Sequence, residues 1–408
     1  MADLVVVGAG LSGLFAATIA AAKGAQVILV AQGRGGLSIS HGCIDARAQE
    51  RAPGEASHGL PPHPLALTGI GVLRSACAQL QTLLSAAELP YFGSLDAQVE
   101  TLTPLGRRRP TQFAPASLKL PQPRLSDRAA IAGIEGFRDF VPALTVRGLA
   151  ACGETPALLS DLPLPGSPPR RDPYATDVAR LLEDDLDLSE LSRLWRPRLL
   201  GIEMLGLPAV LGLTDHSRVK SELESALDLP IFEIATLPPN LPGLRLEAAL
   251  RRAALRAGVT LIEGARVLGR LEGGTSARHA LGVVAETAGG GRFLSAGNIL
   301  LATGGVLNGG LETDIHGRIR ESVFEIPVAS IPRREDWVGP GLASAHAYTH
   351  FGVRVNDQMQ PVDAAGERFA ANLYAAGGVI AGPDRSLGAC RQGIDLATAY
   401  RAVEVILG

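Results

Sequence analysis

The sequence has few cysteines and no excess of charge, and both features narrow the range of functions. Its 408 residues include four cysteines, which lie far apart and form no Cys-X-X-Cys pair. Iron–sulfur and zinc motifs of the usual spacing are therefore excluded from this chain, and the cysteine content fits a reducing compartment. The 38 basic and 41 acidic residues give a formal net charge of -3. This balance argues against nucleic acid as a partner, whereas local arginines remain able to bind a small anionic substrate.

Long hydrophobic runs are also missing. The apolar stretch Leu11–Ala22 is too short to span a bilayer and contains Ser12 and Gly13. The N-terminus lacks the basic region of a signal peptide. We therefore expect a cytoplasmic protein without direct membrane insertion, in which any membrane link runs through a partner. The hydrophobic content of 46% is compatible with a large packed core, and the length predicts about two or three domains.

The clearest motif lies in the first thirty-two residues. An apolar strand at Leu4–Val7 runs into the turn Gly8–Gly13, an alanine-rich helix follows as far as Lys23, and a second strand covers Gln26–Val30. This order of strand, glycine turn, helix and strand is typical of a nucleotide-binding βαβ unit.

Each glycine of the turn has a predicted task. Gly8 allows a tight exit from the strand, Gly10 lets a pyrophosphate approach the backbone, and Gly13 lets the helix pack closely on the strand. The helix begins at Leu11 and Ser12, so its unpaired N–H groups and positive dipole end favour a bound anion. The sequence therefore predicts a nucleotide cofactor whose pyrophosphate lies at this turn.

One usual part of such a unit is absent. An acidic residue at the end of the second strand normally binds the ribose hydroxyls, but here Val30 is followed by Ala31 and Gln32. Gln32 can hydrogen-bond a ribose without the strength that a charge adds. The phosphate interactions predicted above do not depend on this position.

A glycine-rich loop follows at Gly33–Asp45. Its backbone amides can lie along a flavin or its phosphates, with contacts from Gly33, Ser40, His41 and Gly42; the alternative is a surface loop without a ligand. His41 is a candidate flavin contact or covalent attachment point, or an ordinary loop histidine.

The middle of the chain carries no cofactor motif. The patterns predict a helix at Thr68–Ala87, a basic turn at Arg107–Arg109, a loop or linker at Gly153–Pro173, and one or two helices between Asp177 and Leu200. The default interpretation of the basic triplet is a solvated charge run, and the alternative is a phosphate site. We assign 88–235 to an inserted substrate or partner domain, between flavin-binding segments at 1–87 and 236–408.

The C-terminal part returns to cofactor-type elements. A helix around 246–257 and short strands at 259–262, 267–271, 281–287 and 292–295 precede a buried strand that starts at Asn298. That strand runs into glycine, with Ala302, Thr303 and Gly304 as candidate cofactor contacts. A further strand ends at Gly377 and Gly378, and Cys390 precedes a helix at 394–406 whose N-terminus can face a flavin. The predicted fold is α/β: a Rossmann-like FAD-binding domain assembled from distant segments, with an inserted α+β domain.

These glycine segments give the chain a resemblance to two-dinucleotide-binding-type flavoproteins, and among them it most resembles the B subunit family of anaerobic glycerol-3-phosphate dehydrogenases. The particular segments are Ser40–Asp45, Ala235–Pro239, Gly309–Leu311, Gly317–Glu321, Phe351–Val353 and Gly388–Cys390.

The resemblance implies a flavin subunit that works with a second flavin subunit and an iron–sulfur, membrane-associating subunit. Together such subunits oxidise sn-glycerol 3-phosphate to dihydroxyacetone phosphate and pass electrons to quinone in anaerobic respiration. The family is commonly described with FMN in this subunit, whereas the turn at Gly8–Gly13 is of the kind that binds a dinucleotide, FAD. Both cofactors stay open at this point.

Candidate catalytic residues lie between the two glycine strands and at the last helix. A base for the hydroxyl proton and cations for the phosphate are needed, and histidine and arginine suit these tasks. The candidates are His316, Arg320, His350 and Arg391. Two alternatives compete with a dehydrogenase that binds substrate itself: an electron-transfer or structural flavin subunit without a substrate site, and a different flavin oxidoreductase of the fumarate reductase-like or amino-acid-oxidising kind.

Overall fold

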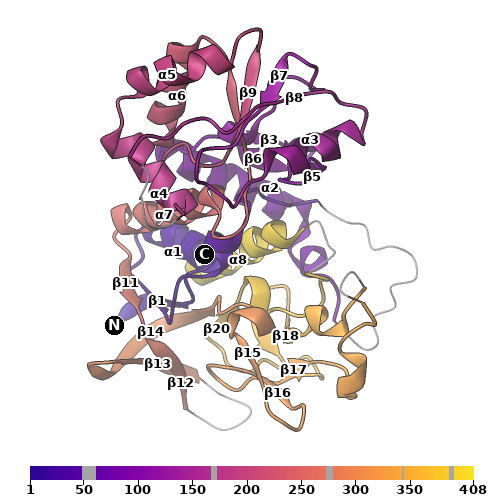
Figure 1. The fold of residues 1–408 in the computed structure, drawn as a ribbon. Helices are drawn as coiled ribbons and strands as arrows, with labels where there is room; N and C mark the ends of the chain where they lie inside the picture. Colours follow the sequence, from indigo (N-terminus) through magenta and orange to yellow (C-terminus); the bar gives the residue numbers. More distant parts are fainter. Residues whose placement is uncertain (48–60, 167–171, 273–278, 342–343, 386–389) are drawn as a thin grey trace. The chain divides into compact units, whose positions relative to one another are not determined.

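A computed structural model describes residues 1–47, 61–166, 172–272, 279–341, 344–385 and 390–408 (Figure 1). Its contacts divide the chain into two compact units. Unit 1 comprises Met1–Gly36, Asp45–Leu83 and Leu250–Gly408, and unit 2 comprises Leu37–Ile44 and Leu84–Ala249. The predicted insertion, 88–235, falls within unit 2, and its boundaries as a domain stay predictions. Within the described residues, no helix is both long and apolar enough to cross a membrane.

Unit 1 is built on a seven-stranded sheet with the order β11-β2-β1-β14-β13-β12, and β20 pairs with β14. Five strands run parallel to their neighbours: β1 (Ala2–Val7), β2 (Val27–Ala31), β11 (Thr260–Glu263), β14 (Gly290–Leu301) and β20 (Leu373–Ala375). The strands β12 (Arg266–Glu272) and β13 (His279–Thr287) add an antiparallel extension. Because β1, the end of β14 and β20 are buried on both faces, their continuous apolar runs are the expected sequence of parallel strands.

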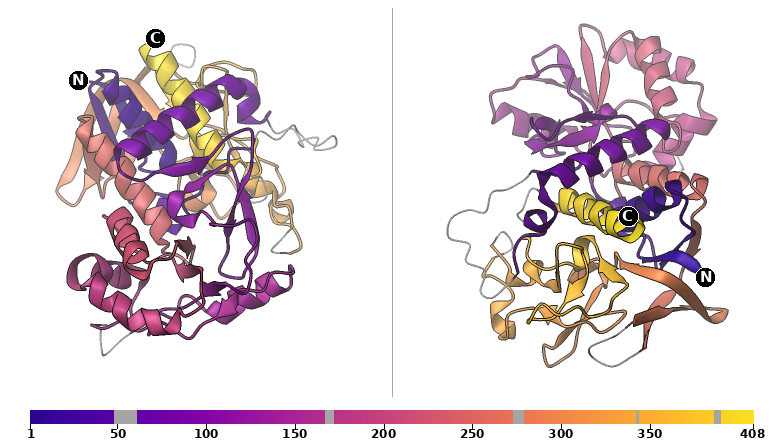
Figure 2. Two further views of the ribbon diagram at one scale, coloured as in Figure 1. Left: turned by 90° about the horizontal axis from the view of Figure 1, so that it is seen from above. Right: turned by 180° about the vertical axis from the view of Figure 1, so that it is seen from behind.

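The sheet joins segments from the start, the middle and the end of the chain. Helix α1 (Leu11–Ala22) follows β1, and the C-terminal helix α8 (Arg391–Leu407) packs beside it (Figure 2). The predicted assembly of one α/β flavin-binding domain from distant segments is thereby confirmed.

One strand prediction is wrong in detail. The segment 292–295 and the strand from Asn298 form a single strand, β14. Gly297 does not interrupt it, because the first half pairs with β13 and the second half pairs with β1 in unbroken succession.

The predicted helix at Thr68–Ala87 is α2 (Pro64–Ala86), which begins earlier and has a kink at Gly69, where φ is 80°. Helix α7 covers Leu241–Arg256.

Unit 1 also contains short strands that pair locally. They are β15 (Leu311–Thr313), β16 (Ile319–Glu321), β17 (Val328–Ala329), β18 (Gly352–Val355) and β19 (Pro361–Val362). The last residue of β16, Glu321, is fully buried, and its carboxylate accepts hydrogen bonds from the backbone N–H groups of Val323 and Phe324. Burial raises the pKa of Glu321 to about 7, although those two N–H groups oppose the shift.

This carboxyl predicts a pH dependence of stability. Its folded-state pKa of about 7 lies above the ordinary value of 4.5, so the folded state holds the proton more tightly than the unfolded state does. The favourable contribution is fully present below about pH 4.5 and is lost as pH rises towards 7, by on the order of 3 kcal/mol. The free energy of unfolding in urea is measured at pH 5 and at pH 8. In Glu321→Gln, we expect the difference between these two values to lack the contribution of Glu321. Glu325→Gln, at an exposed neighbouring carboxyl, is the control and should keep it; an unchanged difference in Glu321→Gln would contradict the assignment.

Unit 2 has a four-stranded, all-parallel sheet with the order β10-β9-β7-β8. Its strands are β7 (Ala129–Ile131), β8 (Ala157–Leu158), β9 (Met204–Pro208) and β10 (Ile231–Ile234). The helices are α3 (Pro142–Ala150), α4 (Ala175–Arg180), α5 (Leu188–Trp195) and α6 (His216–Leu227), and α5 and α6 lie side by side in Figure 1. Two antiparallel pairs complete it: β3 (Tyr91–Gly93) with β6 (Phe113–Pro115), and the hairpin of β4 (Val99–Leu102) with β5 (Arg108–Thr111).

One sequence prediction in unit 2 is corrected and another is refined. The stretch Gly153–Pro173 is largely irregular where it is described, as predicted, and its one short strand is the two-residue edge strand β8; residues 167–171 lie outside the described residues. Arg108, predicted within a solvated basic turn, lies in β5 and makes a two-fold hydrogen bond to the buried carboxylate of Glu154, at 2.8 and 2.9 Å. The local sequence does not distinguish an arginine in a short, partly buried strand from an arginine in a surface turn.

Candidate functional site

The turn between β1 and α1 is packed so closely that only glycine fits at two positions. A Cβ added to Gly8, whose φ is +114°, would lie 2.2 Å from the carbonyl oxygen of Ala302. A Cβ on Gly13 would lie 1.9 Å from the carbonyl oxygen of Gly8. The first glycine therefore lets β1 touch the end of β14, and the second lets α1 touch the turn.

Gly10 is different, because a Cβ there would meet nothing within 4 Å. Gly10 is also the N-cap of α1, which has no side-chain cap and no acidic residue in its first turn. There is thus open space beside the N-cap, and the first N–H groups of the helix carry its positive dipole end. This is the space and the chemistry that a pyrophosphate requires, so the turn fits a dinucleotide.

The other predicted glycine segments come together beside this turn. A Cβ on Gly377 would lie 2.1 Å from Ser12 Oγ, and one on Gly378 would lie 2.9 Å from Gly304 Cα. The hydroxyl oxygen of Thr303 is buried and makes no hydrogen bond within the described residues. Such an unsatisfied buried group is uncommon, and it marks a place where a bound molecule can supply the missing partner.

Other nearby residues were not among the named candidates, although Gly35 lies in the predicted loop Gly33–Asp45. A Cβ on Gly35 would lie 2.6 Å from Gly10 Cα, so the segment after β2 lies against the phosphate turn. Arg385 Nη2 donates to the carbonyl oxygen of Gly377 at 2.6 Å, and its Nη1 lies 3.4 Å from Asp395 Oδ1. Burial lowers the pKa of Arg385, while Asp395 opposes this shift. Arg385 carries no distinguishing local pattern, and only the fold brings it to Gly377.

The positions after β2 lie at the carboxyl end of the parallel strands. Gln32 is exposed immediately after Ala31, and a Cβ on Gly33 would meet nothing within 4 Å. Their predicted roles at the ribose and along the cofactor stay proposals.

The remaining loop candidates belong to unit 2. Ser40 Oγ accepts from the N–H of Gly42, and His41 Nδ1 accepts from the N–H of Cys43. The hydroxyl of Tyr91 donates to the carbonyl oxygen of Gly42 at 2.6 Å. These contacts fix the loop within its own unit, and the predicted flavin contact of Ser40, His41 and Gly42 stays a proposal.

Cys390 is the N-cap residue of α8 and is almost fully buried. Its sulfur lies 3.4 Å from His63 Nε2. Burial raises the pKa of Cys390 to about 11, so it is a neutral thiol near pH 7. The adjacent residues Gly388 and Ala389 lie outside the described residues.

The four catalytic candidates have different environments. His316 is exposed in the turn between β15 and β16, and Arg320 on β16 forms ion pairs with Glu325 and Glu312 at 2.8 and 3.6 Å. His350 Nδ1 lies 3.0 Å from the carbonyl oxygen of Gly382, which identifies Nδ1 as the protonated nitrogen. Arg391 is exposed at the first position of α8, and its Nη2 would lie 3.9 Å from a Cβ on Gly36.

Glycine turn, uncapped helix and converging strand ends together define a dinucleotide-binding flavoprotein. The chain matches the family model described as an FAD binding domain over residues 3–387, and it belongs to that family. FAD is accordingly its cofactor.

The relatives narrow the family further. The chain is 30% identical to the B subunit of the anaerobic glycerol-3-phosphate dehydrogenase of Vibrio cholerae serotype O1, over 99% of this chain and 96% of the relative. It is also 30% identical to the corresponding B subunit of Pectobacterium carotovorum subsp. carotovorum, over 99% and 98% of the two chains. The chain therefore belongs to the B subunit family of anaerobic glycerol-3-phosphate dehydrogenases, as the sequence motifs predicted.

Solved structures with a similar course of the chain are more distant. The 3-ketosteroid delta1-dehydrogenase from Sterolibacterium denitrificans is 12% identical with a TM-score of 0.46, and 99% of each chain is covered. A flavocytochrome c3 fumarate reductase is 13% identical with a TM-score of 0.43, over 100% of this chain and 79% of that chain. A similarity this low says nothing of what this chain binds or oxidises.

Proposed function

We propose that this chain oxidises sn-glycerol 3-phosphate to dihydroxyacetone phosphate and that its electrons pass through partner subunits towards quinone. The observation that carries the proposal is the 30% identity, over nearly the whole length of both chains, to subunits named for this dehydrogenase. The phosphate turn with open space at Gly10 supports it, because the flavin that the reaction needs fits there.

We assign cofactor binding to unit 1. Gly8, Gly10 and Gly13 would shape the phosphate site, Leu11 and Ser12 would offer backbone N–H groups, and the orphan hydroxyl of Thr303 would gain a partner. The remaining contacts proposed in unit 1 are Gln32, Gly33, Ala302, Gly304, Gly377, Gly378 and Cys390. The flavin contacts expected from Ser40, His41 and Gly42, which belong to unit 2, stay predictions. When bound, the flavin supplies the two-electron oxidation, and the protein supplies position and electrostatics.

For the substrate, His350 is the base that we favour. With a proton on Nδ1 facing Gly382, the lone pair of Nε2 can accept the hydroxyl proton, and Asp384 Oδ2, 3.8 Å away, would stabilise the resulting cation. Arg391, which stands at a helix N-terminus, is our candidate for the substrate phosphate. Arg320 is less available, since an anion there would displace Glu325. His316 remains a second candidate base.

An electron-transfer subunit without its own substrate site is the second candidate function. The ion-paired state of Arg320 and the exposed position of His316 favour it, because neither residue has the environment of a prepared catalytic group. In either case the proposed partners are a second flavin subunit and an iron–sulfur subunit that associates with the membrane. The inserted region 88–235 would face substrate or one of these partners.

Anaerobic titration of the isolated holoprotein with sn-glycerol 3-phosphate separates the two functions. Loss of the flavin's visible absorption with formation of dihydroxyacetone phosphate is expected, and glycerol should have no effect. His350→Gln should slow flavin reduction by about 100-fold or more; His279→Gln, at an exposed histidine, is the control. A flavin that stays oxidised with substrate, yet is reduced by dithionite, would overturn the dehydrogenase proposal in favour of the electron-transfer subunit.

A further inference from the structure

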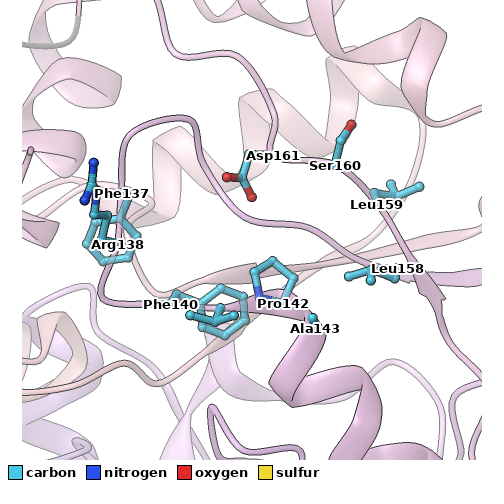
Figure 3. Close-up of a pocket in the computed structure, with 10 residues that line it drawn as sticks. Phe137, Arg138, Phe140, Pro142, Ala143, Leu158, Leu159, Ser160 and Asp161 are labelled. Atoms are coloured by element: carbon cyan, nitrogen blue, oxygen red, sulfur yellow. The ribbon is translucent and has the colours of Figure 1, made fainter.

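Unit 2 contains a pocket whose lining includes none of the residues proposed for the flavin or the substrate. It has a volume of about 780 Å³ and lies where the chain leaves β7 and β8, at the start of α3 (Figure 3). In the view of Figure 3, Phe137 and Phe140 lie on one side, Leu158 and Leu159 on the other, and Asp161 between them. The loops after parallel strands commonly form binding sites of this size.

The pocket is surrounded by apolar side chains that remain accessible to solvent. Phe137 and Phe140 are buried in its wall, whereas Val141 is 48% exposed and Leu158 is 52% exposed at its edge. Leu144, one helical turn after Val141, is 44% exposed. An apolar rim around an apolar pocket is characteristic of a surface that a protein partner covers.

Two carboxylates, Asp161 in the pocket lining and Glu135 close enough to act on its charge, give the pocket a negative side, and its lining arginine, Arg138, is paired with another carboxylate. The carboxylate of Asp161 lies against the backbone of Gly133, where an added Cβ would meet Asp161 Oδ1 at 2.2 Å. Desolvation and the charge of Glu135 raise the pKa of Asp161. Arg138 is turned to Asp172, with Nε 3.1 Å from Oδ2. In the part of the chain that the structure describes, neither Asp161 nor Glu135 has an ion-pair partner.

Charge and shape together define what fits this pocket. An apolar side chain would fill the space between the two phenylalanines and Leu158, and a cation beside it would relieve the repulsion between Asp161 and Glu135. A free apolar molecule would leave the three exposed rim residues in water, but a polypeptide segment would cover them as well.

We propose that the Phe137–Asp161 pocket docks a segment of a partner subunit that presents an apolar side chain next to a lysine or arginine. The partner is one of the two subunits named under the proposed function, so the inference rests on that assembly and not on the identity of the substrate. Small organic cations and a second copy of this chain are the competing occupants.

Hydrogen exchange on the full chain, alone and in the reconstituted complex with both partner subunits, tests the inference. Slower exchange is expected at 137–144 and 157–161 in the complex. Leu158→Asp should weaken assembly by about 10-fold or more, and Asp161→Lys should weaken it most at low salt, because it turns attraction into repulsion. Leu200→Asp, at a leucine of unit 2 that is 84% exposed and outside the pocket, is the matched control.

Each other outcome overturns the inference. A complex that forms without protection of these segments would place the interface elsewhere, and protection of the chain alone at high concentration would identify a second copy as the occupant. A chain that never assembles with either partner also contradicts it. Flavin reduction by sn-glycerol 3-phosphate, measured on the same variants, shows independently whether the proposed reaction holds, since the pocket is not part of the proposed flavin site.

Discussion

The Gly10→Val variant is expected to fold and to bind FAD at least about 100-fold more weakly than the parent chain. Nothing lies within 4 Å of a Cβ at Gly10, and its φ of -79° is open to any residue, so the substitution is compatible with the fold. The added side chain would fill the open space beside the N-cap of α1. Losing two charge-assisted hydrogen bonds to phosphate costs roughly 3 kcal/mol or more, which is a factor of about 100 in affinity.

Two controls make this result specific to the phosphate turn. Gly71→Val also places its Cβ in open space, on the exposed side of α2, and should keep FAD. Gly13→Ala should lose both FAD and stability, because its Cβ would lie 1.9 Å from the carbonyl oxygen of Gly8. Fluorescence titration of the apoproteins with FAD, together with thermal unfolding, measures both effects. Full FAD affinity in Gly10→Val would contradict the placement of the pyrophosphate.

The Arg245→Met variant is expected to have the largest effect on stability, a loss of about 3–5 kcal/mol in the free energy of unfolding. Arg245 on α7 and Glu233 on β10 form a buried ion pair whose side chains are 2% and 0% exposed. Arg245 also donates from Nε and Nη2 to the carbonyl oxygen of Gly212, at 2.9 and 2.7 Å. The substitution leaves a buried carboxylate and a buried carbonyl without their main partner.

The pKa values of the neighbouring groups offer a second readout. Burial alone would raise the pKa of Glu233, but the charge and hydrogen bonds of Arg245 hold it below its usual value. Burial lowers the pKa of His216 to about 4, and Arg245 contributes to this shift. Without Arg245, both pKa values should rise, which NMR titration can follow.

The double variant Arg245→Met/Glu233→Met is the matched control for the lost stability. It removes both charges and should recover a large part of the loss, because two apolar side chains can occupy the buried site. Arg128→Met, at an exposed arginine paired with Glu203, should change stability by less than about 1 kcal/mol. A small effect of Arg245→Met in urea unfolding would show that the pair is not held in a dry interior.

The sequence was sufficient to predict the strand, glycine turn and helix around Gly8–Gly13 because the signal is local. Glycine spacing, a preceding apolar strand and a following helix lie within one continuous stretch, Leu4–Lys23. The same holds for the strands that end at Leu301 and Ala375, since buried parallel strands are continuously apolar. Three strands that each end in glycine predicted one domain built from distant segments. The close approach of Gly377 to Ser12 and of Gly378 to Gly304 became visible only in the fold.

Other features depend on residues that are distant in sequence. Arg385 meets Gly377 through a turn without a recognisable motif, and Arg245 meets Glu233 because a helix folds back on a strand end. The default interpretation of Arg108 as a solvated charge failed for the same reason, since Glu154 comes from another part of unit 2. Pairing of buried charges is a tertiary property, and composition or periodicity does not encode it.

The most direct test of the central claim is the identity and amount of the bound flavin. Acid release from purified protein, followed by chromatography against FAD and FMN standards, should give FAD at about one equivalent per chain, and Gly10→Val purified in parallel should carry little. FMN in the parent chain, retained in Gly10→Val, would contradict the claim, because a mononucleotide has no pyrophosphate to place at the Gly8–Gly13 turn.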